Sequence, residues 1–264
     1  MKLSASFNVS LISELFSYLL LVLFLYSGYI RFGWKTTFLF LVASIYWTMP
    51  LENFGVLMNF FNYCTPSTSL CSKYLLWIGN VPFWISIGWF DVTFPAFHIS
   101  DYFVKANTWT KAVVGGLIAV NLDLILDPAA TSSKLWIWTH ESFYILGVPV
   151  TNYIAWFLLV TLFIIVFEKT VFRKESINFM KPIENILFKG LQNSSSNRNM
   201  VVTLFLRLTF FQLLFIIIYT PISAAFMHLS TIVGWLRIDE TNEVYKKLKE
   251  CNIIIEIKYF RFLV

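Results

Sequence analysis

Long apolar runs separated by short polar connectors constrain this chain more than any other feature. A helix needs about 20 mostly apolar residues to cross a hydrocarbon core of about 30 Å. Six segments meet that need, at residues 10–30, 36–61, 74–98, 108–127, 151–168 and 200–228. The sequence therefore predicts an all-α fold, a polytopic integral membrane helical bundle of six to seven transmembrane helices. We expect kinks at Pro50, Pro82 and Pro221, which neighbouring helices can accommodate.

The composition agrees with this class. Of the 264 residues, 58% are hydrophobic and 13% are charged, whereas soluble domains average about 25% charged residues. These values exclude disordered, nucleic-acid-binding and small disulfide-rich proteins. The net charge of +5 lies in short connectors and a tail, so we expect a lipid bilayer and no nucleic acid as partner.

The positions of Lys and Arg predict the orientation, because basic residues in short connectors mark the cytoplasmic side. Ten of them, from Arg31 to Arg198, fall on one side and three on the other. We therefore expect a multi-pass protein, in the cell membrane, whose N-terminus faces outward. The predicted bundle covers 1–230, with a polar cytoplasmic loop at about 174–199. A charged C-terminal tail, 231–264, does not follow the orientation pattern.

Acidic residues within the predicted spans are candidate functional groups, since ionisable side chains in a membrane are costly and usually face a bundle interior. At 1.5 Å per residue, Glu52 lies about 25 Å along its helix from Lys35, and Asp127 about 24 Å from Lys111. Lys35 and Lys111 are assigned to the same side, so both carboxyl groups should reach the same depth. Asp123 lies one turn from Asp127, on the same helical face.

Two further charges in the spans allow other interpretations. Arg207 lies near the start of its span, and we expect its guanidinium to extend to the membrane interface. Asp91 is expected near the far boundary of its span with Asp101 and Lys105, in a structural or a catalytic role.

The connector 128–150 has too many large apolar side chains for an ordinary exposed loop. It contains Trp136 and Trp138, and Asn152 and Trp156 follow at the start of the next span. The rings form either an interfacial aromatic belt or the lining of a pocket in which positive charge develops. We expect the connector to fold back onto the mouth of the bundle.

Two blocks of residues together resemble a signature of the membrane carotenoid-biosynthesis family that includes carotenoid 1,2-hydratases. The first block comprises Glu52-x-x-Gly55-Val56, Val81-Pro82 and Trp89. The second comprises Asn121-Leu-Asp123-Leu-Ile-Leu-Asp127-Pro128, Trp136-x-Trp138, Gly147-Val148-Pro149, Asn152 and Trp156. The resemblance spans roughly residues 50 to 157.

The resemblance implies an enzyme of carotenoid biosynthesis, a hydratase that adds water to the terminal double bond of an acyclic carotenoid and gives a tertiary alcohol. Protonating such an alkene needs a strong acid and creates a carbocation, which water captures. A carboxyl group in low-dielectric surroundings keeps its proton and suits this step. The catalytic candidates are Glu52, Asp123 and Asp127, with Glu52 and Asp127 as acid and base in an order that the sequence leaves open.

The candidates for substrate binding are Trp136, Trp138, Asn152 and Trp156. Each aromatic ring would stabilise the cation by about 0.5 to 2 kcal/mol, and Asn152 would orient water. The reaction requires no metal and no redox cofactor. The expected partners are the acyclic carotenoid and other membrane enzymes of the carotenoid pathway.

Two other functions fit the same residues. Asp123-x-x-x-Asp127 resembles half of the Mg²⁺-diphosphate site of membrane prenyltransferases, which need a second carboxylate-rich motif; the sequence has no evident one. A small transporter or scaffold would use the acids as a proton relay or to satisfy one another. A continuous polar path would indicate a transporter, whereas an apolar tunnel ending at the carboxyl groups would indicate an isoprenoid enzyme.

The histidines and cysteines form no metal-site pattern. His98, His140 and His228 lack the paired spacing of a di-iron site. Cys64 and Cys71 flank a short turn on the predicted outer side, where both a disulfide and free thiols fit and free thiols are favoured.

Overall fold

The computed structural model describes residues 5–63, 74–105, 107–139, 143–177, 180, 182 and 197–235. Several sequence-based predictions lie outside these residues. They concern the tail beyond residue 235, most of the loop 174–199, and Cys64, Cys71 and His140.

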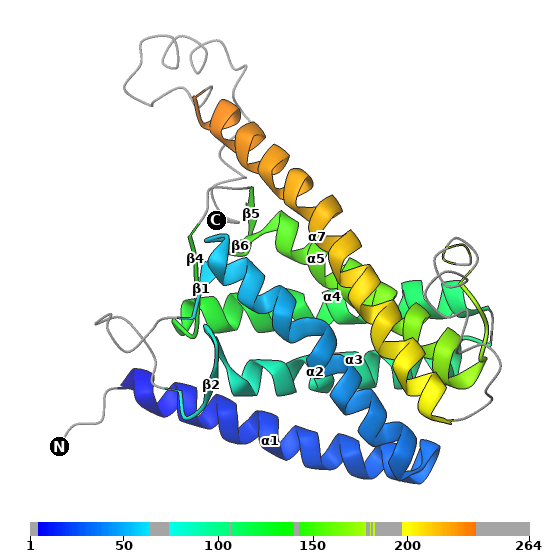
Figure 1. Ribbon diagram of the computed structural model, residues 1–264. Coiled ribbons are helices and arrows are strands. Elements are labelled where there is room, and N and C mark those ends of the chain that lie inside the picture. Colours follow the sequence, from blue (N-terminus) through cyan, green and yellow to red (C-terminus); the bar gives the residue numbers. More distant parts are fainter. Residues whose placement is uncertain are drawn as a thin grey trace, which may run out of the picture.

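Long helices make up most of the described chain (Figure 1). They are α1 (Ala5–Phe32), α2 (Trp34–Leu57), α3 (Phe83–Phe103), α4 (Thr108–Ser132), α5 (Val150–Phe167) and α7 (Asn197–Trp235), and a π-helical turn, Glu168–Phe172, continues α5. Short antiparallel strands join them at one end: β1 (Phe61–Asn62) pairs with β4 (Ile137–Trp138), β2 (Trp77–Ile78) with β3 (Val81–Pro82), and β5 (Tyr144–Ile145) with β6 (Val148–Pro149).

Each of the six predicted segments overlaps one long helix, but the predicted start of the third segment is wrong. Residues 77–82 form the β2–β3 hairpin, in which Gly79 has a φ of 64°, and the helix begins only at Phe83. Pro82 directly precedes α3 instead of kinking it, because a proline has no N–H for a hydrogen bond inside a helix and suits a helix start. The second segment also ends early, at Leu57.

The protein is a helical membrane protein. Among the described residues, four helical segments are long and apolar enough to cross a membrane, namely Val9–Phe32, Thr108–Ser132, Val150–Phe172 and Met200–Ser230. Large apolar side chains such as Leu15, Leu19 and Val22 on α1 are more than half exposed, as expected of a surface that faces lipid. Helices α2 and α3 pack beside these segments.

Helix α3 lies at the centre of the arrangement. It packs against α1, α2 and α4, and α5 packs against α4 and α7; Figure 1 shows α3 between α1 and α4. An aromatic cluster fills the interior between α2, α3 and α5. The Phe40 ring lies 4.7 Å from that of Phe167 and 5.5 Å from that of Phe94, within the range of favourable aromatic pairs.

Basic residues gather at one end of the bundle, where α1 and α3 end and α4 begins. Arg31 Nη2 lies 2.6 Å from Asp101 Oδ2, and Lys111 Nζ lies 2.7 Å from Asp101 Oδ1 and 2.9 Å from Glu168 Oε1. Arg173 Nε also contacts Glu168, at 3.0 Å. These basic residues belong to the set assigned to one membrane side, and the side that they face stays a prediction.

The prediction that the Arg207 guanidinium extends to the membrane interface is wrong in that the side chain is buried within the protein. The Arg207 side chain points to this same end of the bundle but is only 4% exposed. Its Nη1 atom donates to Thr170 Oγ1 at 2.8 Å and to the backbone oxygen of Glu175 at 2.9 Å. The segment that follows α5 therefore supplies the acceptors that interface water would otherwise provide.

Asp91 does not lie at the boundary predicted for it. Because α3 begins at Phe83, Asp91 lies near the middle of the helix, about 15 Å along its axis from Asp101. Its Oδ2 atom accepts a 2.7 Å hydrogen bond from Ser17 Oγ of α1.

Candidate active site

Glu52, near the C-terminal end of α2, accepts two hydrogen bonds. Tyr63 Oη donates to Oε2 at 2.6 Å, and Trp89 Nε1 of α3 donates to Oε1 at 2.7 Å. Burial and the neighbouring Glu52 raise the pKa of Tyr63 well above its usual value, so its phenol keeps the proton that it donates. Glu52 is thus an acceptor in both hydrogen bonds and is oriented by two other segments of the chain.

Asp123 and Asp127 share one amide donor. Asn152 Nδ2, in the first turn of α5, donates to Asp127 Oδ2 at 2.6 Å and to Asp123 Oδ2 at 3.0 Å. The aspartates lie one turn apart on α4 and are 0% and 2% exposed. Within the described residues, Asp123 Oδ1 has no hydrogen-bond partner. Both hydrogens of the amide are used, so only its carbonyl oxygen remains for another contact.

A cavity of about 570 Å³ leads to these groups, a volume typical of small-molecule sites. It runs between α1 and α4 over α3. Its walls are largely apolar and include Phe16, Leu20 and Phe24 of α1, Gly88, Val92, Pro95 and Ile99 of α3, and Ile118, Leu122 and Leu126 of α4. Glu52, Asp127 and Asn152 line the end near the short strands, and Asp91 lies partway along.

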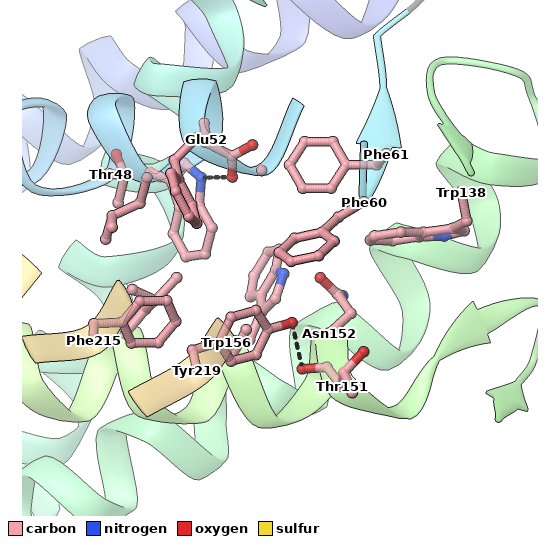
Figure 2. Close-up of a pocket in the computed structure, with 16 residues that line it drawn as sticks. Thr48, Glu52, Phe60, Phe61, Trp138, Thr151, Asn152, Trp156, Phe215 and Tyr219 are labelled. Carbon is pink, nitrogen blue, oxygen red and sulfur yellow. Dashed lines mark hydrogen bonds between the residues drawn. The ribbon is translucent and has the colours of Figure 1, made fainter. Parts of the chain in front are cut away.

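A second cavity has a volume of about 60 Å³, and Figure 2 shows the side chains that line it. Both cavities are lined by Glu52, Phe61, Trp89, Trp138, Asn152 and Trp156, which therefore form the partition between them. The other polar residues around the small cavity are Thr48, Thr151 and Tyr219. Asp127 lines only the large cavity, and Asp123 lines neither of the two.

Aromatic rings enclose this region. The Trp89 and Trp156 rings lie 4.6 Å apart, and Phe61 meets the edge of Trp138 at 5.6 Å. Pairing of β1 with β4 places Phe61 opposite Trp138. The described part of the connector up to Thr139 therefore folds back onto the bundle mouth, as the sequence predicted, and Trp136 and Trp138 line the cavity.

The structure brings six of the seven candidate site residues to the cavities, namely Glu52, Asp127, Trp136, Trp138, Asn152 and Trp156. The seventh, Asp123, lies behind Asp127. Sequence reasoning missed Tyr63, and it did not place Asp91 in the cavity. No sequence signal indicates the Tyr63 contact, because it depends on the path of the chain after α2. The catalytic and binding roles of these residues stay predictions.

No set of three or more His, Cys, Asp or Glu side chains within the described part of the chain is arranged to hold a metal ion. The three acids near Asn152 receive their hydrogen bonds from amide, indole and phenol donors.

Comparison with known proteins identifies the family. A family model described as "carotenoid biosynthesis protein" matches residues 10–235. A bisanhydrobacterioruberin hydratase from Haloarcula japonica is 31% identical over 94 residues, which cover 34% of this chain and 31% of the hydratase. The chain thus matches about a third of the length of this relative. No solved structure matches the chain. The chain belongs to the carotenoid biosynthesis protein family.

Proposed function

We propose that this protein is a cofactor-independent hydratase that adds water to the terminal double bond of an acyclic carotenoid end group. One observation carries the proposal: a largely apolar cavity ends at the carboxyl groups of Glu52, which is half-buried, and of Asp127, which is buried. The family supports a carotenoid as the substrate class, and the hydratase relative supports addition of water as the reaction.

The apolar walls suit a polyene chain. Ile118 and Asp127 both line the cavity on α4, and they lie nine positions apart in the helix, which is about 14 Å along its axis. A hydrocarbon chain along α3 and α4 would gain about 25 cal/mol for each Å² of apolar surface removed from water. Its end group would then lie beside Glu52 and Asp127, where the chemistry takes place.

The site groups can supply acid–base chemistry. One carboxyl group would protonate the alkene, and the other would accept a proton from the attacking water. The rings of Trp89, Trp138 and Trp156 line this end of the cavity and would stabilise the intermediate cation by about 0.5 to 2 kcal/mol each. Asn152 would hold Asp127 in place through its 2.6 Å hydrogen bond.

The same geometry argues against the two alternative functions. A transporter needs a polar path, whereas apolar side chains of α1, α3 and α4 form most of the cavity wall. A prenyltransferase would present paired carboxylates to a metal and a diphosphate. Here Asp123 faces neither cavity and shares the Asn152 amide with Asp127, so the pair offers one accessible carboxyl group.

A multi-pass position in the cell membrane fits this function, since carotenoids dissolve in the bilayer. Access from the lipid phase would bring the substrate directly to the cavity between α1 and α4. Phe16 of α1 and Leu126 of α4 line the cavity and are 59% and 45% exposed. Other carotenoid-pathway enzymes in the same membrane would supply and consume the pigment.

Expression in cells that accumulate lycopene or another acyclic carotenoid tests the proposal. We expect a pigment heavier by one molecule of water, and we expect Glu52→Gln or Asp127→Asn to abolish it. Glu175→Gln is the matched control, because the Glu175 side chain is 49% exposed and pairs with Lys169 at 3.1 Å, away from the cavities. Unchanged pigment with several acyclic substrates, with the protein verified in the membrane, would refute the proposal. A Mg²⁺-dependent gain of a five-carbon unit would identify a prenyltransferase instead.

A further inference from the structure

We infer that the small cavity holds the water molecule that is added, and that the partition between the cavities assigns Asp127 as the proton donor and Glu52 as the base. The inference rests on the proposed hydration and resolves the acid–base order that the sequence leaves open.

The argument begins with which carboxyl group faces which cavity. Asp127 lines only the large cavity, where the alkene would lie. Glu52 lines both cavities, so it is the carboxyl group of the two that adjoins the small cavity, where the water would lie. A donor must contact the alkene, and a base must contact the water. The position of Asp127 therefore suits the proton donor, and the position of Glu52 suits the base.

The small cavity has the size and polarity that a bound water molecule needs. Its volume is about 60 Å³, whereas one water needs about 10–15 Å³ and two to four polar partners. Thr151 Oγ1 is buried and has no hydrogen-bond partner among the described residues, and Trp138 Nε1 is in the same condition. Thr151, Asn152 and Glu52 all line the small cavity (Figure 2), so the Thr151 hydroxyl, the carbonyl oxygen of Asn152 and the carboxyl group of Glu52 supply both donors and acceptors.

The reaction balances with these groups alone. The π electrons of the alkene take the proton of the Asp127 carboxyl group, forming a C–H bond and a tertiary cation. A lone pair of the water oxygen then forms the C–O bond where the two cavities meet, between the side chains of the partition, and the water proton passes to the Glu52 carboxylate. Transfer of that proton from Glu52 to Asp127 restores the site. The net change is addition of one water to one alkene.

The test separates protonation from water capture. Membranes containing the protein are incubated with an acyclic carotenoid in D₂O, and both alcohol and deuterium in the recovered alkene are measured. A cation that is not captured loses a proton and returns to alkene, which then carries deuterium. We expect Thr151→Val and Glu52→Gln to lower alcohol formation at least tenfold while deuterium still enters the alkene. We expect Asp127→Asn to abolish both signals.

Thr161→Val is the matched control. Thr161 lies on the same helix as Thr151, its Oγ1 is also buried without a partner in the described part of the chain, and it lines neither cavity. We expect it to leave both signals at wild-type levels. Equal loss of both signals in the folded Glu52→Gln and Thr151→Val proteins would overturn the assignment, and so would deuterium exchange by Asp127→Asn. Failure of the wild-type protein to form alcohol would instead refute the proposed function.

Discussion

The Asn152 amide is the most informative single group to remove, because from α5 it donates a hydrogen bond to each of the two aspartates. Leucine is close to asparagine in size but has no donor. Asn152→Leu would therefore leave the carboxyl groups of Asp123 and Asp127 without their hydrogen bonds of 3.0 Å and 2.6 Å. A buried polar group that loses its partner costs about 1–3 kcal/mol. Two such losses predict a fall of about 2–6 kcal/mol in the free energy of unfolding.

Activity should fall as well. Asp127 would lose the contact that orients it toward the large cavity, and loss of a hydrogen bond worth about 1.5–3 kcal/mol lowers a rate about 10- to 150-fold. Asn121→Leu is the control, because Asn121 is exposed on α4 and its amide donates only to the backbone oxygen of Leu117, at 2.8 Å. We expect that variant to keep wild-type stability and activity.

The measurements are thermal unfolding in detergent and the rate of alcohol formation in membranes. A folded Asn152→Leu protein with the melting temperature and hydration rate of the wild type would refute the reasoning. Loss of stability together with an unchanged rate would show that the amide supports the fold without orienting the acid.

Two further predictions concern the fold. Gly116→Ala should lower the free energy of unfolding by about 1–3 kcal/mol, because its Cβ would overlap Thr161 Oγ1 and lie 2.9 Å from the backbone oxygen of Phe157. In Gly88→Ala the added Cβ would meet nothing within 4 Å, so this variant should not lower the melting temperature. Equal destabilisation by both variants would contradict this account. Lys111→Met should lower the free energy of unfolding by about 3 kcal/mol, because it removes the cation between the half-buried carboxylate of Asp101 and the buried carboxylate of Glu168. A chemical denaturation curve in detergent checks the value. An unchanged midpoint would argue against the ion cluster as a stabilising contact.

Much of the architecture could be predicted from local patterns in the sequence. Apolar runs located the helices, because the bilayer requires about 20 apolar residues for each crossing. Counting residues from Lys35 and Lys111 predicted that Glu52 and Asp127 reach one level, and both line the same end of one cavity. Helical rise is nearly constant, so distances along a helix follow directly from the sequence.

Prediction from apolar runs failed where the chain changes direction. The third helix was predicted to begin at residue 74, but Pro82 and the hairpin at Gly79 delay its start to Phe83. This shift moves Asp91 from a boundary to the middle of α3. A hydropathy pattern does not separate an apolar hairpin from the first turns of a helix, because both consist of apolar residues.

The sequence by itself determined a membrane-embedded helical bundle with acidic groups at a shared depth, since hydropathy and helical periodicity are local properties. Only the tertiary structure decided which groups touch: Tyr63 with Glu52, one amide with two aspartates, and a partition of aromatic rings between two cavities. These contacts join residues distant along the chain. They depend on how helices rotate and pack against each other, which no single segment encodes.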